Sequence, residues 1–427
     1  MKFLIMSGTG DGLGLGIYLK DRGHQVAAWI HDKHSAHNFD GLLLKPNKWE
    51  TFLDKDTVVI FDGSGGGRTG DRLRARGFAV FMGSVFADQL ELDREIAFEF
   101  MRQVGIKTPH SETFGDFNSA KAFVKKNPQR WAFKVSGEFA NDPHVHTYVS
   151  SDADDMIEML NYFEEVATKK PEFELQEFKE GVAISTEGWF NGKEFMKPFN
   201  HTVERKQLMN KNLGPSGGCA GNLVWAWPQG TNHIIEEGIG LMAPILEEYG
   251  YVGPIDLNTV VNREGVWALE FTPRFGYDAF PALLEIFQGD IGEDLIAPLA
   301  RGEHPKEMVL KSGYGSALRI NVPPYPSDQF HHEGGVPIRG FEKEDRPHLF
   351  FYDAMLSDKN KLVTSPASGA LVAITSSGET PQLAFDYPYE KAKKAKIPDK
   401  MYRTDLVDVL GKDIAEFNDI LSVRTKV

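Results

Sequence analysis

Cysteine is nearly absent from this sequence. Cys219 is the single cysteine among 427 residues, which excludes an internal disulfide and is typical of a reducing cytoplasm. Basic residues are also outnumbered, because 47 Lys and Arg stand against 61 Asp and Glu, for a formal net charge of −14. This balance argues against a nucleic-acid-binding surface, although a site within the protein can still be locally basic.

Long apolar runs are missing as well. No stretch approaches the ~20 apolar residues that a membrane-spanning helix needs. The apolar start over residues 1–6 soon meets Gly8, so it predicts a first strand and not a signal peptide. We therefore expect a cytoplasmic protein that acts on small molecules and has neither a membrane nor a nucleic acid as partner. The length predicts roughly three domains.

Strands and helices alternate over the first hundred residues. The patterns predict strands over 3–6, 25–30, 57–62 and 79–82, a glycine-rich loop over 8–16, and helices over 17–22, around 71–76 and over 90–104. Such alternation predicts a parallel, doubly wound sheet. The glycine run does not match the dinucleotide pattern Gly-x-Gly-x-x-Gly, although Asp32 could supply the acid that such a site requires.

The rest of the chain mixes the two kinds of element. Strands are expected over 131–135, 173–178 and 182–190, helices over 152–165 (capped by Ser151 or Asp152), 233–249, 280–288 and 405–419, and short strands from about 313, of which 371–374 is the clearest. Residues 214–218 are expected to form a glycine-rich loop whose amides could approach an anion.

A hairpin carries the most informative pattern. Pro254–Val261 predicts a strand, 262–265 a turn, and Val266–Thr272 the returning strand. If Gly265 forms a bulge, Asp256 and Glu270 lie opposite each other on one face, whereas a register slipped by one separates them. Two facing carboxylates favour Mg²⁺ carrying nucleotide phosphates; the alternative is an ordinary solvated face. Arg274 follows, and its guanidinium suits an anionic oxygen.

Two other strands carry polar residues. Lys134 stands inside the apolar strand 131–135, where it is either paired with an anion or directed outward by the alternation of side chains. Gln176, Glu177 and Phe178 end another strand and could either offer acceptors to a nucleotide or simply terminate the strand. The pairs His144/His146 and His331/His332 lack partners that would indicate a metal site.

In this order the segments resemble the ATP-grasp superfamily, and within it the phosphoribosylamine–glycine ligase family. Residues 270–276 read Glu-Phe-Thr-Pro-Arg-Phe-Gly, where the family has Glu-Phe-Asn-x-Arg-Phe-Gly. Residues 131–137 are similar to the family's strand with an ATP-binding lysine, 176–178 to its adenine-binding Glu-Glu-Phe, and 214–218 to its Gly-Pro-Asn-Thr-Gly-Gly. Residues 89–91 match the start of a helix that bears a phosphate-binding lysine, a position held here by Arg94.

The resemblance implies an α/β and α+β architecture of three parts. These are a Rossmann-like N-terminal domain (1–105), an ATP-grasp body (106–315) with a lid at about 115–190, and a small α+β C-terminal domain (316–427). It implies an ATP-dependent ligase of purine biosynthesis that joins a carboxylate to an amine through an acyl phosphate. It also implies ATP in the cleft between lid and body, Mg²⁺ or Mn²⁺, and a monomer or homodimer.

The resemblance also assigns roles to residues. The metal ligands would be Asp256, Glu270 and Thr272. The catalytic groups would be Arg274 and Lys134. The nucleotide would contact Arg94, Lys134, Gln176, Glu177, Phe178 and Glu180. The other substrates would contact Gly10, Asp11, Gly65, Gly66, Gly217, Gly218 and Arg274.

Several segments depart from the family pattern. Thr272 replaces an Asn ligand, and Asn141-Asp142-Pro143-His144 replaces a Gly-Lys-Gly lid. Val182 and Ala183 replace acids, which leaves Glu180 for the ribose. Near the N-terminus, 9–13 and 63–67 differ from the loops that shape the sugar-phosphate site. The sequence therefore leaves open another amine–carboxylate pair, or a nucleotide-binding protein without ligase activity.

Overall fold

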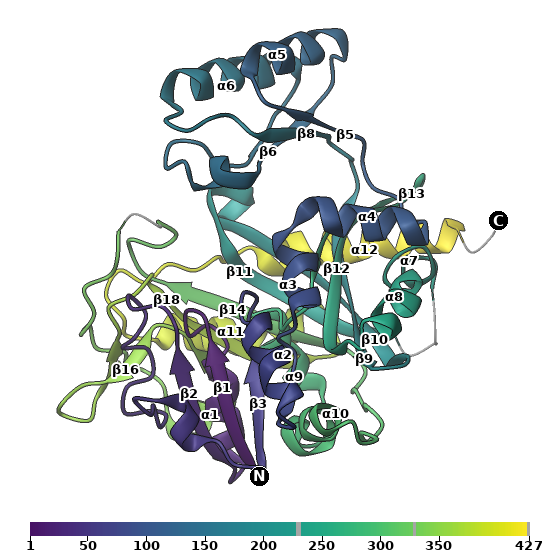
Figure 1. Ribbon diagram of the computed structural model, residues 1–427. Helices are drawn as coiled ribbons and strands as arrows, with labels where there is room; N and C mark the ends of the chain where they lie inside the picture. The colour runs from purple at the N-terminus through teal and green to yellow at the C-terminus, as the bar shows by residue number, and fades with distance from the viewer. Residues whose placement is uncertain (228–231, 328–329, 425–427) are drawn as a thin grey trace. The chain divides into compact units, whose positions relative to one another are not determined.

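The computed structural model describes residues 1–227, 232–327 and 330–424, without the side chains of residues 141 and 424. The chain forms two compact units (Figure 1). Unit 1 consists of Met1–Ile106, Val182–Val266 and Glu270–Val427, and unit 2 consists of Lys107–Gly181 and Trp267–Leu269. The division into three domains at residues 105 and 315 remains a prediction.

Unit 1 begins with the parallel sheet that the sequence predicts. Its strand order is β2-β1-β3-β4, with β1 Lys2–Ser7, β2 Gln25–Ile30, β3 Thr57–Phe61 and β4 Ala79–Phe81. The first two helices are α1 Leu13–Asp21 and α2 Gly67–Ala75. Helix α1 begins earlier than predicted, because Gly14 and Gly16 belong to it and not to a loop. A Cβ on Gly16 would come within 2.8 Å of Leu43, so glycine permits the close packing of this helix.

The helix predicted over 90–104 is two helices. They are α3 Val85–Leu92 and α4 Arg94–Val104. The prediction of one helix was wrong because Asp93 has an extended backbone and caps α4, its carboxylate accepting a bond from the Ile96 amide at 3.2 Å. Residues 93–104 therefore contain the N-cap residue with which a separate helix begins.

A second, antiparallel sheet spans most of the remaining unit 1. Its order is β13-β12-β9-β10-β11-β14-β18-β15. The strands are β9 Val182–Asn191, β10 Phe195–Met209, β11 Leu213–Trp227, β12 Val252–Asn262, β13 Gly265–Thr272, β14 Tyr314–Asn321, β15 Leu349–Phe351 and β18 Ala370–Gly378. The hairpin prediction is confirmed by β12 and β13. The loop predicted at 214–218 is wrong, because these residues belong to β11 and Ser216 pairs with Gln207 of β10.

Helices and a small hairpin complete unit 1. They are α7 His233–Glu237, α8 Ala243–Glu248, α9 Ala279–Ile286, α10 Ala297–Arg301, α11 Pro381–Lys394, α12 Leu406–Arg424, and the pair β16 Ala354–Leu356 and β17 Leu362–Thr364. The helix predicted over 233–249 is interrupted at Gly238, whose φ of −122° and ψ of −118° are not helical. Helix α12 contacts β9, β10, β11 and β12 of the large sheet.

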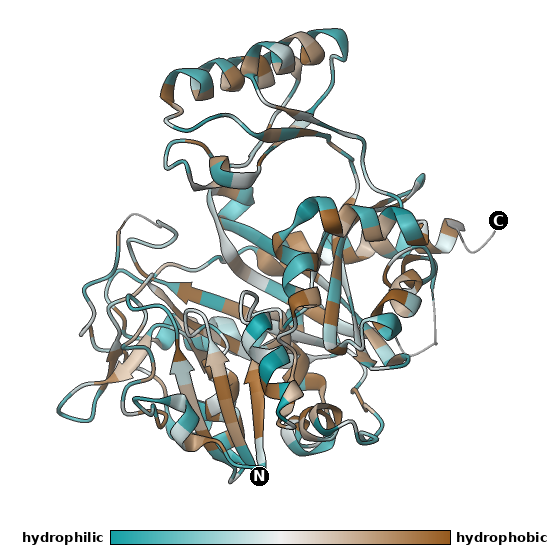
Figure 2. Cartoon of the chain, in the orientation of Figure 1, coloured by the Kyte–Doolittle hydropathy of each residue, from teal (hydrophilic) through white to brown (hydrophobic). Residues whose placement is uncertain are grey.

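Unit 2 is a four-stranded sheet with two helices. The strand order is β5-β8-β6-β7, with β5 Ser111–Phe114, β6 Trp131–Val135, β7 Tyr148–Val149 and β8 Phe173–Glu177, and the helices are α5 Phe117–Lys126 and α6 Ala153–Val166. Asp152 caps α6 as predicted, accepting a bond from the Asp155 amide at 2.9 Å. Both helices carry hydrophilic outer faces (Figure 2). They cover an aromatic core that includes Phe133, Phe163 and Phe173.

The mixed α/β fold class predicted from the sequence is confirmed. Both faces of the parallel sheet are buried, Phe3, Ile5 and Ile60 in the largest core of unit 1 and Leu4 and Val59 in a second one. No helix within the described ranges is long and apolar enough to span a membrane.

Candidate functional site

Unit 1 contains a cavity of about 580 Å³ that gathers residues from distant parts of the chain. Among its lining residues are Asp256, Glu270, Thr272, Arg274, Asp11 and Gly218, all of which the sequence singled out. It brings together the three predicted metal ligands and the predicted catalytic arginine. Their roles remain predictions.

Asp256 is a partly buried acid of the site. Its Oδ1 atom is inaccessible to solvent and has no hydrogen-bond partner among the described residues. Burial raises the pKa of Asp256 to about 7, and the charges of Glu204 and Glu270 add to the rise, against a lowering by Ser185. Glu187 pairs with Asp256 across β9 and β12, and burial, reinforced by Asp256, raises its pKa to about 8. A cation beside Asp256 would relieve this accumulation of negative charge.

Glu270 and Thr272 lie on β13 at the same cavity. The Glu270 carboxylate is 58% exposed and lies 3.9 Å from Lys206 Nζ. The Thr272 hydroxyl accepts a bond from Asn258 Nδ2 at 3.2 Å. Among described residues, no group of three or more His, Cys, Asp or Glu side chains is placed to hold a metal ion. Two carboxylates and a hydroxyl nevertheless fit Mg²⁺, because this ion usually takes only one or two carboxylates together with substrate phosphates.

Arg274 is held in place by three groups. Its Nη2 and Nε atoms lie 2.8 and 3.0 Å from Glu91 Oε1, and its Nη1 donates to the Phe275 carbonyl at 2.9 Å. The guanidinium carbon lies 4.5 Å from the centre of the Tyr277 ring. A guanidinium fixed in this way can meet an anionic oxygen with little loss of side-chain freedom.

The predicted substrate loops differ in what they offer. Gly10 has φ +102° and a Cβ there would lie 3.1 Å from Asn38, so the turn needs glycine. The amide of Gly65 donates to Asp88 Oδ1 at 2.7 Å and is already occupied. A Cβ on Gly66 would lie 2.5 Å from Phe61. Gly65 and Gly66 therefore serve packing and a turn in this structure, and neither is among the residues that line the cavity.

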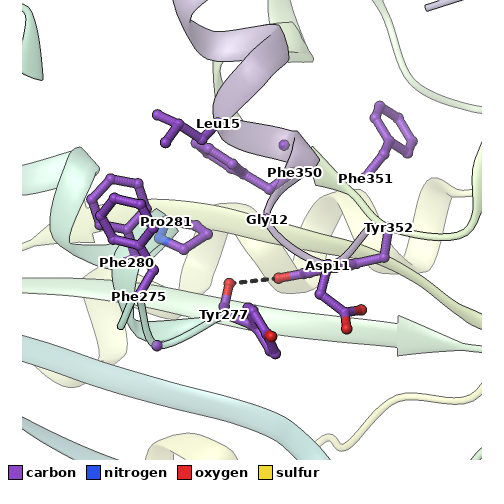
Figure 3. A pocket seen from close by; sticks show the side chains of 12 residues that line it. Asp11, Gly12, Leu15, Phe275, Tyr277, Phe280, Pro281, Phe350, Phe351 and Tyr352 are labelled. Atoms are coloured by element: carbon purple, nitrogen blue, oxygen red, sulfur yellow. Dashed lines mark hydrogen bonds between the residues drawn. The ribbon is translucent and has the colours of Figure 1, made fainter. Parts of the chain in front are cut away.

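A small aromatic pocket adjoins the cavity and shares Asp11, Gly276 and Tyr277 with it (Figure 3). Its volume of about 20 Å³ suffices for about one water molecule. The Tyr352 hydroxyl lies 2.8 Å from the Tyr277 carbonyl oxygen and 2.7 Å from Asp278 Oδ1. Tyr352, which lines this pocket, therefore helps to hold Asp278 and Tyr277 in place. The pocket itself is too small for a substrate.

Glycines of β11 allow the strand to approach Tyr325. A Cβ on Gly217 would lie 2.6 Å from the Tyr325 hydroxyl oxygen. The Gly218 amide donates to the same oxygen at 2.8 Å. Gly218 lines the cavity beside Cys219, so this part of β11 forms a wall of the cavity although it is not a loop.

Unit 2 has a polar face on its sheet. Lys134 pairs with Glu174, and Ala132 pairs with Gln176, across β6 and β8. Because side chains alternate along a strand, Lys134, Glu174 and Gln176 share the face opposite the aromatic core residue Phe133. Glu174 and Gln176 are buried, and their Oε1 and Nε2 atoms have no partner within the described residues. Buried polar atoms without a partner are uncommon, and a water, an ion or a ligand group can satisfy them.

The segment after β8 is held by cation–π contacts and ion pairs. Lys179 Nζ lies 2.7 Å from Glu177 Oε1 and 4.1 Å from the centre of the Trp267 ring. The Arg130 guanidinium lies 3.7 Å from the centre of the Phe178 ring. Its Nη1 lies 3.8 Å from the exposed Glu180 carboxylate. These contacts place Phe178 and Glu180 beside Arg130, with the Glu180 carboxylate exposed to solvent.

Asp142, the acid found in the family's lid position, has a local structural role. Its Oδ2 accepts bonds from the amides of Thr168 and Lys169 at 2.6 and 2.8 Å, and its Oδ1 from the His144 amide at 3.0 Å. Burial opposes ionisation, but these amide donors outweigh it and hold the pKa of Asp142 at about 2. The Asp142 carboxylate thus joins residue 144 to residues 168–169, and these backbone amides already stabilise its negative charge.

Several cavity residues escaped the sequence interpretation. They are Glu91, Glu204, Lys206, Cys219, Asp278, Arg319 and Tyr325. Two signals were visible: Arg319 interrupts the apolar stretch of β14, and Glu91 belongs to the segment 89–91 that resembles the family, although no site role was given to it. Arg94 was predicted to contact phosphate; its Nη1 is buried without a partner among described residues, and it is not one of the cavity-lining residues.

Comparison with known proteins gives one consistent resemblance. The chain is 23% identical over 346 residues to phosphoribosylamine–glycine ligase of Streptococcus pneumoniae, covering 79% of this chain and 80% of that protein. It is 24% identical over 343 residues to the Halalkalibacterium halodurans enzyme of the same name, covering 79% and 78%. No protein-family profile matches the sequence.

Solved structures agree with the sequence relatives. The crystal structure of phosphoribosylamine–glycine ligase from Thermotoga maritima superposes with a TM-score of 0.71 at 20% identity, covering 95% of this chain and 100% of that chain. The chain has the ATP-grasp fold. N5-carboxyaminoimidazole ribonucleotide synthetase of the same organism gives a TM-score of 0.54 at 15% identity over 93% of this chain and 99% of that one. The resemblance to phosphoribosylamine–glycine ligase predicted from the sequence is confirmed.

Proposed function

We propose that this ATP-grasp protein is an ATP-dependent ligase that joins a carboxylate to an amine through an acyl phosphate. The observation that carries the proposal is the cavity in unit 1, where Asp256 Oδ1, which has no partner among the described residues, lies with Glu270 and Arg274. The relatives named phosphoribosylamine–glycine ligase support the same reaction class. We also propose a cytoplasmic enzyme of purine biosynthesis that acts as a monomer or homodimer.

The reaction divides into two balanced steps. In the first, an oxygen of the substrate carboxylate bonds to the terminal phosphorus of ATP, and ADP leaves. In the second, the amine nitrogen bonds to the acyl carbon, phosphate leaves, and the nitrogen loses a proton. The protein mainly orients the reactants and compensates charge in such chemistry. Arg274, held by Glu91, would stabilise the negative charge of the transferring phosphoryl group.

Asp256, Glu270 and Thr272 would hold Mg²⁺, or Mn²⁺, at the phosphates. When bound, the ion neutralises phosphate charge. Asp256 must be ionised to bind it, and its pKa of about 7 makes this binding depend on pH near neutrality. In unit 2, Lys134 would compensate phosphate charge, and Gln176, Glu177, Phe178 and Glu180 would contact the nucleoside. For Arg94, in unit 1, we propose a role in phosphate binding.

The amine and carboxylate remain to be identified. Phosphoribosylamine and glycine are the first pair to test, because the relatives' name states them. Asp11 lines the cavity, and its negative charge suits an ammonium or a hydroxyl better than a phosphate. We therefore propose that Gly10, Asp11, Gly217 and Gly218 shape the site for a substrate that differs from phosphoribosylamine, whereas Gly65 and Gly66 support the loop.

A release assay for ADP tests the function. Purified protein is incubated with ATP, Mg²⁺ and matched amine–carboxylate pairs, among them phosphoribosylamine with glycine. We expect ADP release that requires both substrates, with kcat/KM of at least about 10⁴ M⁻¹s⁻¹ for the physiological pair. Efficient use of phosphoribosylamine and glycine would refute the altered-substrate proposal. Absence of turnover with every pair, together with a thermal shift by ATP, would favour a nucleotide-binding protein without ligase activity.

A further inference from the structure

One carboxylate in the cavity is half satisfied. Asp278 is 3% exposed and lines the cavity. Its Oδ1 atom lies 3.0 Å from Arg319 Nε, 2.7 Å from Arg319 Nη2 and 2.7 Å from the Tyr352 hydroxyl. Its Oδ2 atom is also buried and accepts no hydrogen bond from any residue that the structure describes. The donors of Arg319 and the Tyr352 hydroxyl thus converge on one oxygen. The remaining polar neighbour among the described residues is the Cys219 thiol, a weak donor whose pKa is raised by burial and in part by a hydrogen bond to Asp278.

The position of Oδ2 is fixed by its surroundings. The Arg319 guanidinium lies 4.1 Å from the centre of the Tyr352 ring. The Tyr352 hydroxyl lies between the Tyr277 carbonyl oxygen and Asp278 Oδ1, which share its single proton (Figure 3). The carboxylate therefore cannot readily rotate to share its donors between both oxygens. A buried carboxylate oxygen without a donor is unfavourable and uncommon, so a donor from outside the chain would stabilise it.

The charge of the cavity indicates the kind of donor. Its described lining has six acidic side chains, Asp11, Glu91, Glu204, Asp256, Glu270 and Asp278, against three basic ones, Lys206, Arg274 and Arg319. Burial raises the pKa of Glu204, and the charge of Asp278 adds to that rise although Lys206 opposes it. The field of Asp278 therefore extends along the cavity, and a positively charged donor is favoured over a neutral one.

We propose that Asp278 Oδ2 binds the amino group of the amine substrate as a protonated primary amine, whose nitrogen passes one proton to this carboxylate before it attacks the acyl phosphate. This inference rests on the proposed ligase function, because it places the nucleophile in the cavity that contains Asp256 and Glu270. Arg319 and Tyr352 are positioning residues that orient the carboxylate. A hydroxyl could complete the hydrogen bond but would leave the excess negative charge, and a metal ion would need more ligands than Asp278 has beside it.

Hydroxylamine separates the amine site from the rest of the reaction. It captures an acyl phosphate as a hydroxamate without occupying a specific amine site when it is present at high concentration. The full-length protein, with Asp278→Asn and Glu285→Gln variants, is assayed for amide formation with phosphoribosylamine and with small primary amines, and for hydroxamate formation. Glu285 is the control, because its carboxylate on α9 accepts bonds from Thr375 and His348 at 2.6 and 2.9 Å and is not one of the cavity-lining residues.

Asp278→Asn should raise the KM for the amine by about 10- to 100-fold, as expected for a lost hydrogen bond to a charged group. Its hydroxamate rate, its KM for ATP and its KM for the carboxylate should stay within about twofold of the parent, and Glu285→Gln should leave all four unchanged. Because Asn leaves Arg319 without a full counter-charge, the double variant Asp278→Asn/Arg319→Gln is made as well, and it should show the same amine-specific defect.

Two results would overturn the inference. An equal fall of amide and hydroxamate formation in both Asp278 variants would assign the residue to the carboxylate or to the fold. An unchanged KM for every amine would exclude the contact. If the parent protein forms neither amide nor hydroxamate, the ligase function itself fails, and this outcome is distinct because it does not involve the variants.

Discussion

Replacement of Asp256 should stabilise the unliganded protein while it abolishes activity. The pKa of Asp256 is raised to about 7 from an ordinary value of 3.8, so the folded state disfavours the ionised carboxylate by about 4 kcal/mol. The folded state binds this proton more tightly than the unfolded state. The contribution of the group to stability is therefore present below about pH 4 and is lost as the pH rises through 7.

Asp256→Asn removes a group whose cost to the folded state begins near pH 4 and is complete above about pH 7. Asn is close in shape, and it also relieves Glu187, whose raised pKa of about 8 owes part of its rise to Asp256. We expect a smaller increase in melting temperature at pH 5, where about 1.6 kcal/mol of the penalty is already present, than at pH 8. With up to about 4 kcal/mol available and about 2 °C per kcal/mol for a large domain, the increase should reach about 4–8 °C.

Differential scanning fluorimetry at pH 5, 6, 7 and 8, without nucleotide or metal, measures this effect. Glu270→Gln is the matched control, because it also removes one acid of the proposed metal site but from a side chain that is 58% exposed. Its free energy of unfolding should change by less than about 0.5 kcal/mol at each pH. A melting temperature of Asp256→Asn that is lowered at pH 8, or raised equally at pH 5, would refute the reasoning.

Three further predictions concern the site and its supports. Glu270→Gln should lower turnover by at least about a hundredfold, or ~2.7 kcal/mol; steady-state ADP release measures this, and full activity would exclude the metal role. Lys134→Ala should weaken ATP binding by at least about tenfold, whereas Lys125→Ala, on the exposed side of α5, should not; titration calorimetry compares them, and equal affinities would argue against a nucleotide role for Lys134. Asp142→Asn should make the loop at 168–169 more sensitive to limited proteolysis at pH 7, because the pKa of Asp142 is held at about 2 and the stabilisation by the charged form is present above about pH 4. In the parent this protection should disappear as the pH falls toward 2, and an unaltered cleavage pattern in the variant would contradict the assigned role.

The sequence predicted local features that depend on neighbours along the chain. The hairpin of β12 and β13 was visible because apolar residues alternate with polar ones on both sides of Asn262–Gly265. That pattern also predicted that Asp256 and Glu270 would face one site, and both line the cavity. The start of α6 was visible because Asp152 precedes an amphipathic stretch.

The errors arose where tertiary contacts outweighed local propensity. Residues 214–218 contain three glycines and a proline, which favours a loop, but the close approach of Tyr325 to Gly217 requires a strand without a side chain at that position. Helix α11 was not predicted at all. It contains Pro388, which ordinarily argues against a helix interior.

The far wall of the cavity could not be predicted from the sequence. Asp278 and Arg319 are separated by 41 residues, and Tyr352 and Asp278 by 74. No periodic pattern links residues at such distances. The pairing of β14 with β11 and β18 is what places Arg319, a charged residue in the apolar strand β14, beside Asp278, which follows β13.

The strand order of the large sheet has a consequence for the synthesis of the protein. Strand β11 pairs with β14, and β14 pairs with β18, so the sheet continues from residues near 220 to residues near 375. While the ribosome has delivered only the first 315 residues, β11 has an unpaired edge that can template association with other chains. Release of the last hundred residues both closes that edge and brings Arg319 to Asp278. A nascent or truncated chain should therefore depend on chaperones. The site at Asp278 that we propose for the amine substrate should be assembled last.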